Sequence, residues 1–296
     1  YMTHPAFLAF DTLGLWVGKF ETGYDGATST ASAQVNSVDT SKIIIKPNVY
    51  SWRSITVGNA FKNSYDYKRD LDSHMMKNTE WGSVAYLQHS KYGSGASVRI
   101  NNNKAYITGY AAVEEPTAGY KGGTSIATNR NELTNLCIDG TYTINYLNSN
   151  SIVASTTNNY SGIYDMSGGA FEYVMGYTTS ATTVGGSSGI TNLYSDFFTN
   201  SIYSKYWNKY NTSSSITYTD YNNRILGDAT GEMGPFGRKT DPDNNPRNNS
   251  GVPPTPWFAR GGVWSFGTGS GIFSFGYRAG GVDSMLSYRI VLAPTK

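Results

Sequence analysis

The sequence predicts a fold that mixes short strands with two helices and joins them by long polar loops. Segments 54–65 and 78–93 carry apolar residues at helical spacing, whereas 14–21, 43–47 and 286–292 have the compact or alternating apolar runs of strands. Glycine, serine, threonine and asparagine fill the stretches between them. The 296 residues suffice for one large domain or two small ones.

Charge and cysteine content exclude several classes of protein. The net charge is +2, charged residues make up 15% and no basic block exists, so phosphate-driven nucleic-acid binding is not expected. The single cysteine, Cys137, allows neither an internal disulfide nor a cysteine-based zinc site. No apolar run is long enough to span a membrane. The abrupt start at Tyr1, without a signal peptide, suggests the C-terminal part of a longer protein.

The first half of the chain provides the two helices. Gly14–Glu21 is predicted to be a strand covered on both faces, 23–41 a polar loop, and Ile43–Pro47 a short strand that proline ends. A first helix is expected from Ser54 to about Tyr65. A second begins near Asn78 and ends by Gly93, and one of its faces carries Trp81, Val84 and Ala85.

Several polar residues in this half could be interpreted as metal-binding or catalytic residues. His74 and His89 flank the second helix, but without carboxylates at matching spacing they are expected to be solvated or capping residues rather than metal ligands. Residues 97–110 predict a hairpin that turns at Asn101–Asn103. The adjacent Glu114-Glu115 pair would face opposite ways on a strand, so a solvated loop is preferred to an acid–base pair.

A compact motif spans Gly162–Val174, with the sequence GIYDMSGGAFEYV. Gly168-Gly169 predicts a tight turn, and Phe171, Tyr173 and Val174 are expected in the core. Glu172 is expected to bond the backbone of a neighbouring loop, because a buried carboxylate needs partners. A structural role is preferred to catalysis, since no carboxylate at acid–base spacing accompanies it.

Residues 177–256 look like a long insertion with an aromatic patch around Tyr203–Tyr210. Asp241–Pro246 places oxygen ligands at i, i+2 and i+3, as some calcium loops do, but lacks the glycine and terminal glutamate of an EF-hand. A plain turn is preferred, and a structural calcium ion remains open. Pro253–Pro256 is a stiff segment that leads Trp257 into a strand.

The segment 260–292 is the most informative part of the chain. It contains eight glycines interspersed with aromatic residues and ends in the alternating run Leu286–Leu292, which predicts a strand with one buried face. Tyrosine (24 residues), glycine (33), serine and asparagine are the residues of recognition loops. A β-ribbon that merely closes a sheet has the same composition.

Five stretches resemble motifs of the formylglycine-generating-enzyme-like branch of the C-type lectin fold. Gly162–Val174 is similar to the family's G-L-Y-D-M-x-G-N-V-W-E-W-V motif, Arg260–Trp264 to Arg-Gly-Gly-Ser-Trp, and Ser287–Arg289 to Gly-Phe-Arg. Trp16–Glu21 and Thr79–Leu87 resemble the opening strand and a helix of the family. The chain is identified as a member or close relative of one subgroup, the variable proteins of diversity-generating retroelements.

The resemblance implies an α+β C-type lectin fold in which small antiparallel sheets are flanked by two helices with long irregular loops. It implies one domain over 1–296, a non-enzymatic role without a cofactor, and a variable-like binding segment at 260–292. The exposed ligand-binding residues carried over are Val263, Trp264, Phe266, Thr268, Ser274, Gly276, Tyr277, Arg278, Ala279, Asp283, Ser284 and Met285.

The partner implied is a protein or glycan receptor on a cell or virion surface, met by an extracellular protein that can be a homo-oligomer. Two alternatives stay open. One is a fixed adhesin or structural virion protein of the same fold. The other is a formylglycine-generating oxidase, which is disfavoured because the family's chemistry needs a cysteine pair and this chain has Cys137 alone.

Overall fold

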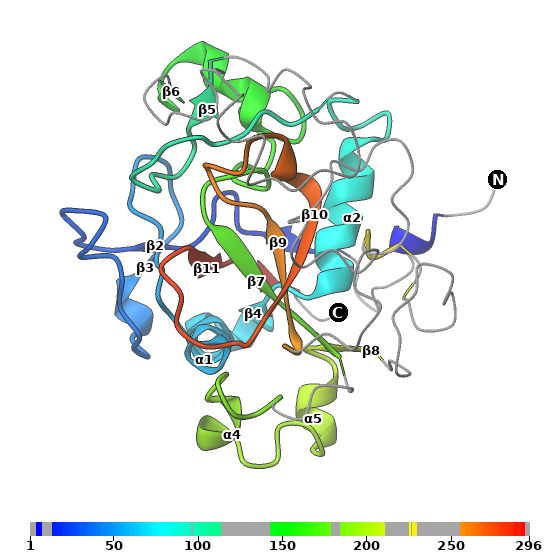
Figure 1. Cartoon of the computed structure of the whole chain (residues 1–296). Coiled ribbons are helices and arrows are strands. Elements are labelled where there is room, and N and C mark those ends of the chain that lie inside the picture. The colour runs from blue at the N-terminus through cyan, green and yellow to red at the C-terminus, as the bar shows by residue number, and fades with distance from the viewer. Residues whose placement is uncertain are drawn as a thin grey trace.

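A mixed sheet of five strands lies in the middle of the molecule (Figure 1). The computed structural model describes residues 4–7, 14–95, 97–113, 143–178, 184–210, 225, 227–229 and 255–293. The strands run in the order β10–β9–β7–β11, with β8 beside β7, and their bounds are Phe171–Thr178 (β7), Asn208–Tyr210 (β8), Trp257–Gly261 (β9), Gly271–Arg278 (β10) and Leu286–Tyr288 (β11). The β7–β9 and β9–β10 pairs are antiparallel, whereas β11 and β8 both run parallel to β7. The sheet is therefore mixed and not purely antiparallel as expected.

Three smaller sheets surround this one. The first joins the two ends of the described chain in the order β1–β12–β4, with bounds Trp16–Val17 (β1), His74–Met75 (β4) and Ile290–Leu292 (β12). The other two are pairs: β2 (Gly23–Tyr24) with β3 (Ile43–Ile44), and β5 (Ala111–Ala112) with β6 (Thr143–Ile144). With these small sheets and few helices, the described chain is a mixed α+β structure.

Two helices of 11 residues flank the central sheet, α1 (Val57–Tyr67) and α2 (Asn78–Gln88), so both predicted helices are confirmed (Figure 1). Thr56 caps α1, because its side chain accepts a hydrogen bond from the Asn59 backbone. Short helices α4 (Ile190–Leu193) and α5 (Ser201–Ser204) lie between β7 and β8. The 3₁₀ turns are Pro5–Phe7, Thr40–Lys42, Arg69–Leu71, Ser149–Ala154 and Gly267–Gly269.

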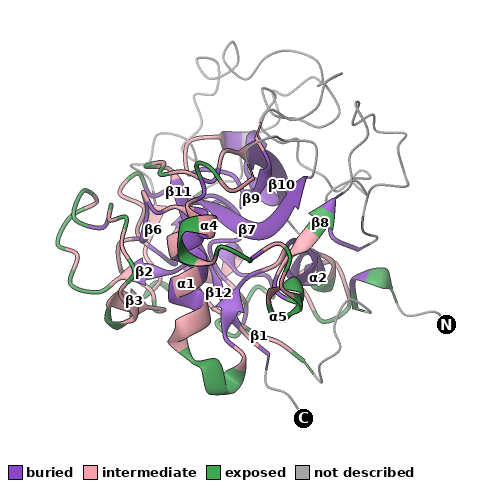
Figure 2. Cartoon of the chain, turned by 90° about the horizontal axis from the view of Figure 1, so that it is seen from below, coloured by how far each residue is buried: buried purple, intermediate pink, exposed green. Residues whose placement is uncertain are grey.

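The core lies between the central sheet and both helices, and β7, β9 and β10 are buried on both faces (Figure 2). Its largest fully buried side chains include Trp52, Trp81, Trp257, Phe171 and Tyr288. Helix α2 is buried around most of its circumference, whereas one face only was expected. It is buried on several sides because the strands β7 and β10 and the turn Pro5–Phe7 all pack against it.

Three predictions of strands are wrong, either in length or in the pairing expected. Gly14–Glu21 contains only the two-residue strand β1. Residues 97–110 form no hairpin: the Asn101 backbone pairs instead with Ser167 and Gly169 of the Gly162–Val174 motif. Leu286–Leu292 divides into β11 and β12, which belong to different sheets, and its residues 286–291 are all buried.

His74 is buried, with 2% of its surface exposed, and not solvated as expected. Its Nδ1 lies 2.7 Å from the Asp72 carbonyl oxygen and its Nε2 lies 3.0 Å from Glu80 Oε1 at the start of α2. Because both ring nitrogens face oxygen acceptors, the ring fits this position best when both carry protons. Burial opposes the charge, but the Glu80 carboxylate outweighs it and raises the pKa of His74.

We predict that His74 contributes stability at low pH and loses it in mild alkali. A group whose pKa is raised on folding gives its full contribution below the unfolded value of 6.5, and the contribution disappears as the pH rises through the folded pKa. The slope for one proton is at most about 1.4 kcal/mol per pH unit. Urea unfolding between pH 6 and 9 should therefore give a shallower decline for H74Q than for the wild type. An NMR titration with the His74 pKa below 6.5 would contradict this.

Candidate functional site

Two buried arginines hold the strands of the C-terminal segment. Arg289, between β11 and β12, makes a bidentate ion pair with Glu172 of β7, and its Nη1 and Nη2 also donate to the carbonyl oxygens of Gly18 and Tyr164. Glu172 therefore pairs with a charged side chain and not with the loop backbone that the sequence suggested. Both side chains of the pair are fully buried, so the pair fixes the chain between β11 and β12 to the central sheet, and the bond to Gly18 adds the segment after β1.

Arg260 of β9 plays a similar part through several hydrogen bonds. Its Nε donates to Ser274 O at 2.9 Å, and its Nη1 donates to Asn78 Oδ1 at 2.8 Å and to the Asp228 carbonyl oxygen at 3.1 Å. The Asp228 carboxylate accepts from the Tyr210 hydroxyl at 2.6 Å. Strands β8, β9 and β10 and the start of α2 thus share one buried polar network.

The glycine pair of the Gly162–Val174 motif turns as expected. Gly168 and Gly169 have φ of 76° and 68°, a conformation that other residues adopt with strain. The turn brings the Gly169 carbonyl oxygen to the backbone N–H of Trp264 at 2.9 Å, and the Ala170 N–H donates to the Glu21 carboxylate at 3.2 Å. The motif therefore sets where the chain after β9 leaves the sheet.

Four predicted ligand-binding residues are buried, and their expected exposure is wrong. They are Val263, Ser274, Gly276 and Tyr277. From Ser274 on, alternate residues of β10 face opposite sides of the sheet, and both sides are covered. Tyr277 packs with Phe258 and Phe275 at ring-centroid distances of 5.4 and 5.0 Å.

Gly276 allows close packing on the opposite face of β10. A Cβ at this position would lie 3.1 Å from Phe171 Cζ, so the glycine leaves room for that ring. The Arg278 guanidinium carbon lies 4.9 Å from the centre of the same ring, and Phe266 packs edge-on against it at 6.1 Å. Phe171 is therefore the buried support for two of the predicted binding residues.

Seven other predicted residues remain accessible. Ser284 is exposed, and Trp264, Phe266, Arg278, Ala279, Asp283 and Met285 are half-buried. Arg278 is the last residue of β10, and the other six come from two loops, one after β9 and one between β10 and β11 (Figure 1). Thr268 belongs to the turn Gly267–Gly269, but its side chain lies outside the described residues. We call the seven accessible residues, without Thr268, the loop surface.

The loop between β10 and β11 is held at several points. The Val57 N–H donates to Gly280 O at 2.9 Å, and the Tyr173 hydroxyl donates to Gly281 O at 2.9 Å. Asp283 Oδ1 accepts from the Met285 N–H at 2.8 Å inside the loop. The side chains of the loop surface are thus presented by a fixed backbone.

Sequence reasoning missed two residues at this surface. Val282 is 56% exposed, and its place between Gly281 and Asp283 could have suggested it. Tyr106, from a segment about 160 positions away, lies with its ring 6.4 Å from that of Trp264 at an interplanar angle of 89°. No signal in the sequence pairs these two distant residues.

A buried group of carboxyls lies next to Arg289. Glu21, Asp165 and Glu172 are almost entirely buried around Arg289. Burial and the neighbouring carboxylates raise the pKa of Glu21 well above its usual value. Burial also raises the pKa of Glu172 to about 7, against the opposing effect of Arg289. The folded protein therefore holds the Glu21 proton more tightly than the unfolded chain does.

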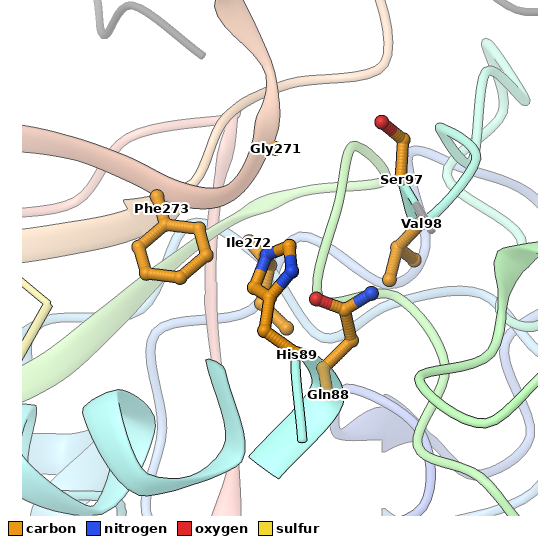
Figure 3. Close-up of a pocket in the computed structure, with 7 residues that line it drawn as sticks. All are labelled: Gln88, His89, Ser97, Val98, Gly271, Ile272 and Phe273. Carbon is orange, nitrogen blue, oxygen red and sulfur yellow. The ribbon is translucent and has the colours of Figure 1, made fainter. Parts of the chain in front are cut away.

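One small cavity of about 30 Å³ lies where α2 ends near the start of β10 (Figure 3). Its lining residues are Gln88, His89, Ser97, Val98, Gly271, Ile272 and Phe273. The volume suits a single water molecule and not an organic ligand. His89 is the C-cap residue of α2, as one of the two sequence readings expected, and burial lowers its pKa.

Several sequence readings lie outside the described residues: Glu114-Glu115, Cys137, Asp241–Pro246 and Pro253-Pro254. In the part of the chain that is described, no group of three or more His, Cys, Asp or Glu side chains could hold a metal ion. Among the helices described, none has the length and hydrophobicity that crossing a bilayer requires.

The fold and the site together define an α+β protein whose C-terminal loops are presented on a buried, arginine-linked sheet. A scan against protein-family models finds no match for the sequence, and a search of curated proteins finds no significant similarity. The functional inference therefore depends on the site.

Proposed function

We propose that this protein is a non-enzymatic binding protein whose loop surface contacts a receptor. The observation that carries the proposal is the contrast between the accessible loop surface and the buried strands of the central sheet that support it. Trp264, Phe266, Arg278 and Met285 are of types that are enriched at the centres of interfaces or at contact surfaces generally. A surface that is already ordered loses little conformational entropy when it binds.

The scaffold we propose is the C-type lectin fold of the formylglycine-generating-enzyme-like branch, with 1–296 as one domain and with the diversified proteins of retroelements as the nearest functional group. Its support is the arrangement of the motif residues. Gly168-Gly169, Glu172, Arg260 and Arg289 all lie at junctions of the central sheet. The receptor would be a protein or glycan on a cell or virion surface, met by an extracellular protein that can assemble with copies of itself.

The experiment is a binding measurement with a matched control. Labelled protein is applied to a printed glycan array and to a panel of bacterial cells, and the variant W264A/M285A is compared with I202S, which alters an exposed residue of α5. Loss of a contact worth about 2 kcal/mol weakens binding about 30-fold. We expect that loss for the double variant and none for I202S. Equal binding by the double variant, or no target for the wild type, refutes the proposal.

Sequencing the gene from many cells of one population separates a diversified binder from a fixed adhesin. Under diversification, substitutions should fall on accessible positions such as Arg278, Ala279, Asp283 and Ser284. They should avoid the buried Val263, Ser274, Gly276 and Tyr277, because changes there disturb packing. An invariant segment combined with intact binding would identify a fixed adhesin.

A further inference from the structure

The segment 53–57, which leads into helix α1 and includes its first residue, holds the loop between β10 and β11. The Ser54 N–H donates to Asp283 O at 3.1 Å, and the Val57 N–H donates to Gly280 O at 2.9 Å. At the residue after Asp283, the Ser284 carbonyl oxygen accepts a hydrogen bond from Arg53 Nη1. Three backbone carbonyl groups of the loop, those of Gly280, Asp283 and Ser284, are thus bonded to one segment from a distant part of the sequence.

Arg53 connects this loop to two further segments. Its Nη2 donates to the carbonyl and hydroxyl oxygens of Thr30 at 2.8 and 2.6 Å, and its guanidinium carbon lies 3.8 Å from the centre of the Tyr106 ring. The residue is 1% exposed. A buried cation is costly unless its hydrogen bonds are made, and the planar fork of arginine serves several acceptors at once in a way that lysine does not.

Two of the seven non-glycine residues with positive φ in the described part of the chain lie at the same place. Ser54 and Tyr106 have φ of 57° and 56°, in the left-handed region that residues other than glycine rarely adopt. The structure holds Tyr106 there through two backbone bonds, from its N–H to Asn103 O and from the Ser51 N–H to its own carbonyl oxygen, both 2.9 Å. Strained residues that surrounding contacts hold in place are characteristic of binding sites.

The strained backbone sets the Tyr106 side chain beside the loop surface. The half-buried ring stands edge-on to Trp264 with Arg53 against its face. Tyr106 is therefore packed between Arg53 and Trp264 and still partly accessible, as a rigid aromatic contact residue is in other recognition surfaces.

We propose that the receptor surface is composite: Tyr106 is a fixed contact residue, and Arg53 is the positioning residue that orders the loop bearing Asp283, Ser284 and Met285. This inference rests on the binding function proposed above. It places a constant aromatic contact, from a part of the chain far from the loops, beside the residues that the loops contribute.

Hydrogen exchange in the free protein tests the positioning role without a ligand. Reporter amides are those of Met285 and Leu286, which bond to Asp283. R53M keeps most of the aliphatic stem and loses the fork, so these amides should exchange at least about tenfold faster while amides of β7 and β9 are unchanged. R53K keeps the charge and should give an intermediate rate. Wild-type rates in both variants, or uniformly faster exchange everywhere, overturn the role.

Replacing Tyr106 tests the contact role. Asparagine tolerates the left-handed region, so Y106N removes the ring and relieves strain at once. We expect a thermal midpoint within about 5 °C of the wild type and about tenfold weaker binding to the array spot or cell that the wild type labels. Unchanged binding refutes the contact role. If the wild type labels no target, the binding function and the contact role fail together, whereas hydrogen exchange still decides the role of Arg53.

Discussion

Replacing Arg289 with methionine should lower the free energy of unfolding by about 3–5 kcal/mol. The substitution leaves the Glu172 carboxyl fully buried without the cation that balances its negative charge. It also removes the donors to Gly18 O and Tyr164 O, which connect β12 to the first strand and to the Gly162–Val174 motif. Urea unfolding at pH 7, followed by far-UV circular dichroism, measures the loss.

Two further variants make this result specific. R289M/E172L removes both charges and should recover much of the loss, because a buried ion pair is often no better than well-packed apolar residues. R69M breaks the ion pair of Arg69 with Asp66 on the surface, where the Arg69 side chain is 59% exposed, and should cost less than about 1 kcal/mol. If R289M lowered the free energy of unfolding as little as R69M does, the buried pair would not stabilise the central sheet.

The second large effect is a pH dependence that E21Q should remove in part. The folded-state pKa of Glu21 is raised above the ordinary value of 4.5 by burial and by its Asp165 and Glu172 neighbours. The folded protein therefore binds this proton more tightly than the unfolded chain does. The contribution is complete below about pH 4.5 and is lost as the pH rises through the folded pKa.

Glutamine keeps an oxygen that can accept the Ala170 N–H and carries no charge. At pH 8 we expect E21Q to be more stable than the wild type by about 1–3 kcal/mol, with little difference near pH 4.5. Urea midpoints taken every half pH unit from 4.5 to 8.5 give both curves. Parallel curves for E21Q and wild type would show that Glu21 does not hold the proton. The Glu172 pKa of about 7 should leave a residual decline in both proteins.

Local sequence patterns predicted the elements whose causes are local. The helix at Asn78 was placed correctly because Glu80 at its third position accepts the Lys77 N–H at 2.8 Å, a cap that depends on neighbouring residues alone. The turn at Gly168-Gly169 was also correct, since positive φ follows from the absence of a side chain. The burial of Phe171, Tyr173 and Val174 agrees with the apolar pattern.

Patterns failed where partners from distant segments decide the outcome. Leu286–Leu292 alternates like one strand, but Arg289 turns into the Glu172 pair and the chain passes from one sheet to another. The Asn101 backbone pairs with the Gly162–Val174 motif and not within a hairpin. For the same reason the exposure of Ser274 and Tyr277 could not be read from alternation, because both faces of β10 are covered.

By itself, the sequence determined the two helices and the glycine turn, since each depends on local conformational preference, and its composition singled out the residues of 260–292 as candidates for binding. Tertiary structure decided which of those residues remain accessible, and it brought Arg53 and Tyr106 to them. The physical reason is that burial and ion pairing are properties of surfaces that meet only after folding. Residues far apart in the chain then share one low-dielectric interior, where an unpaired charge or an unfilled space is costly.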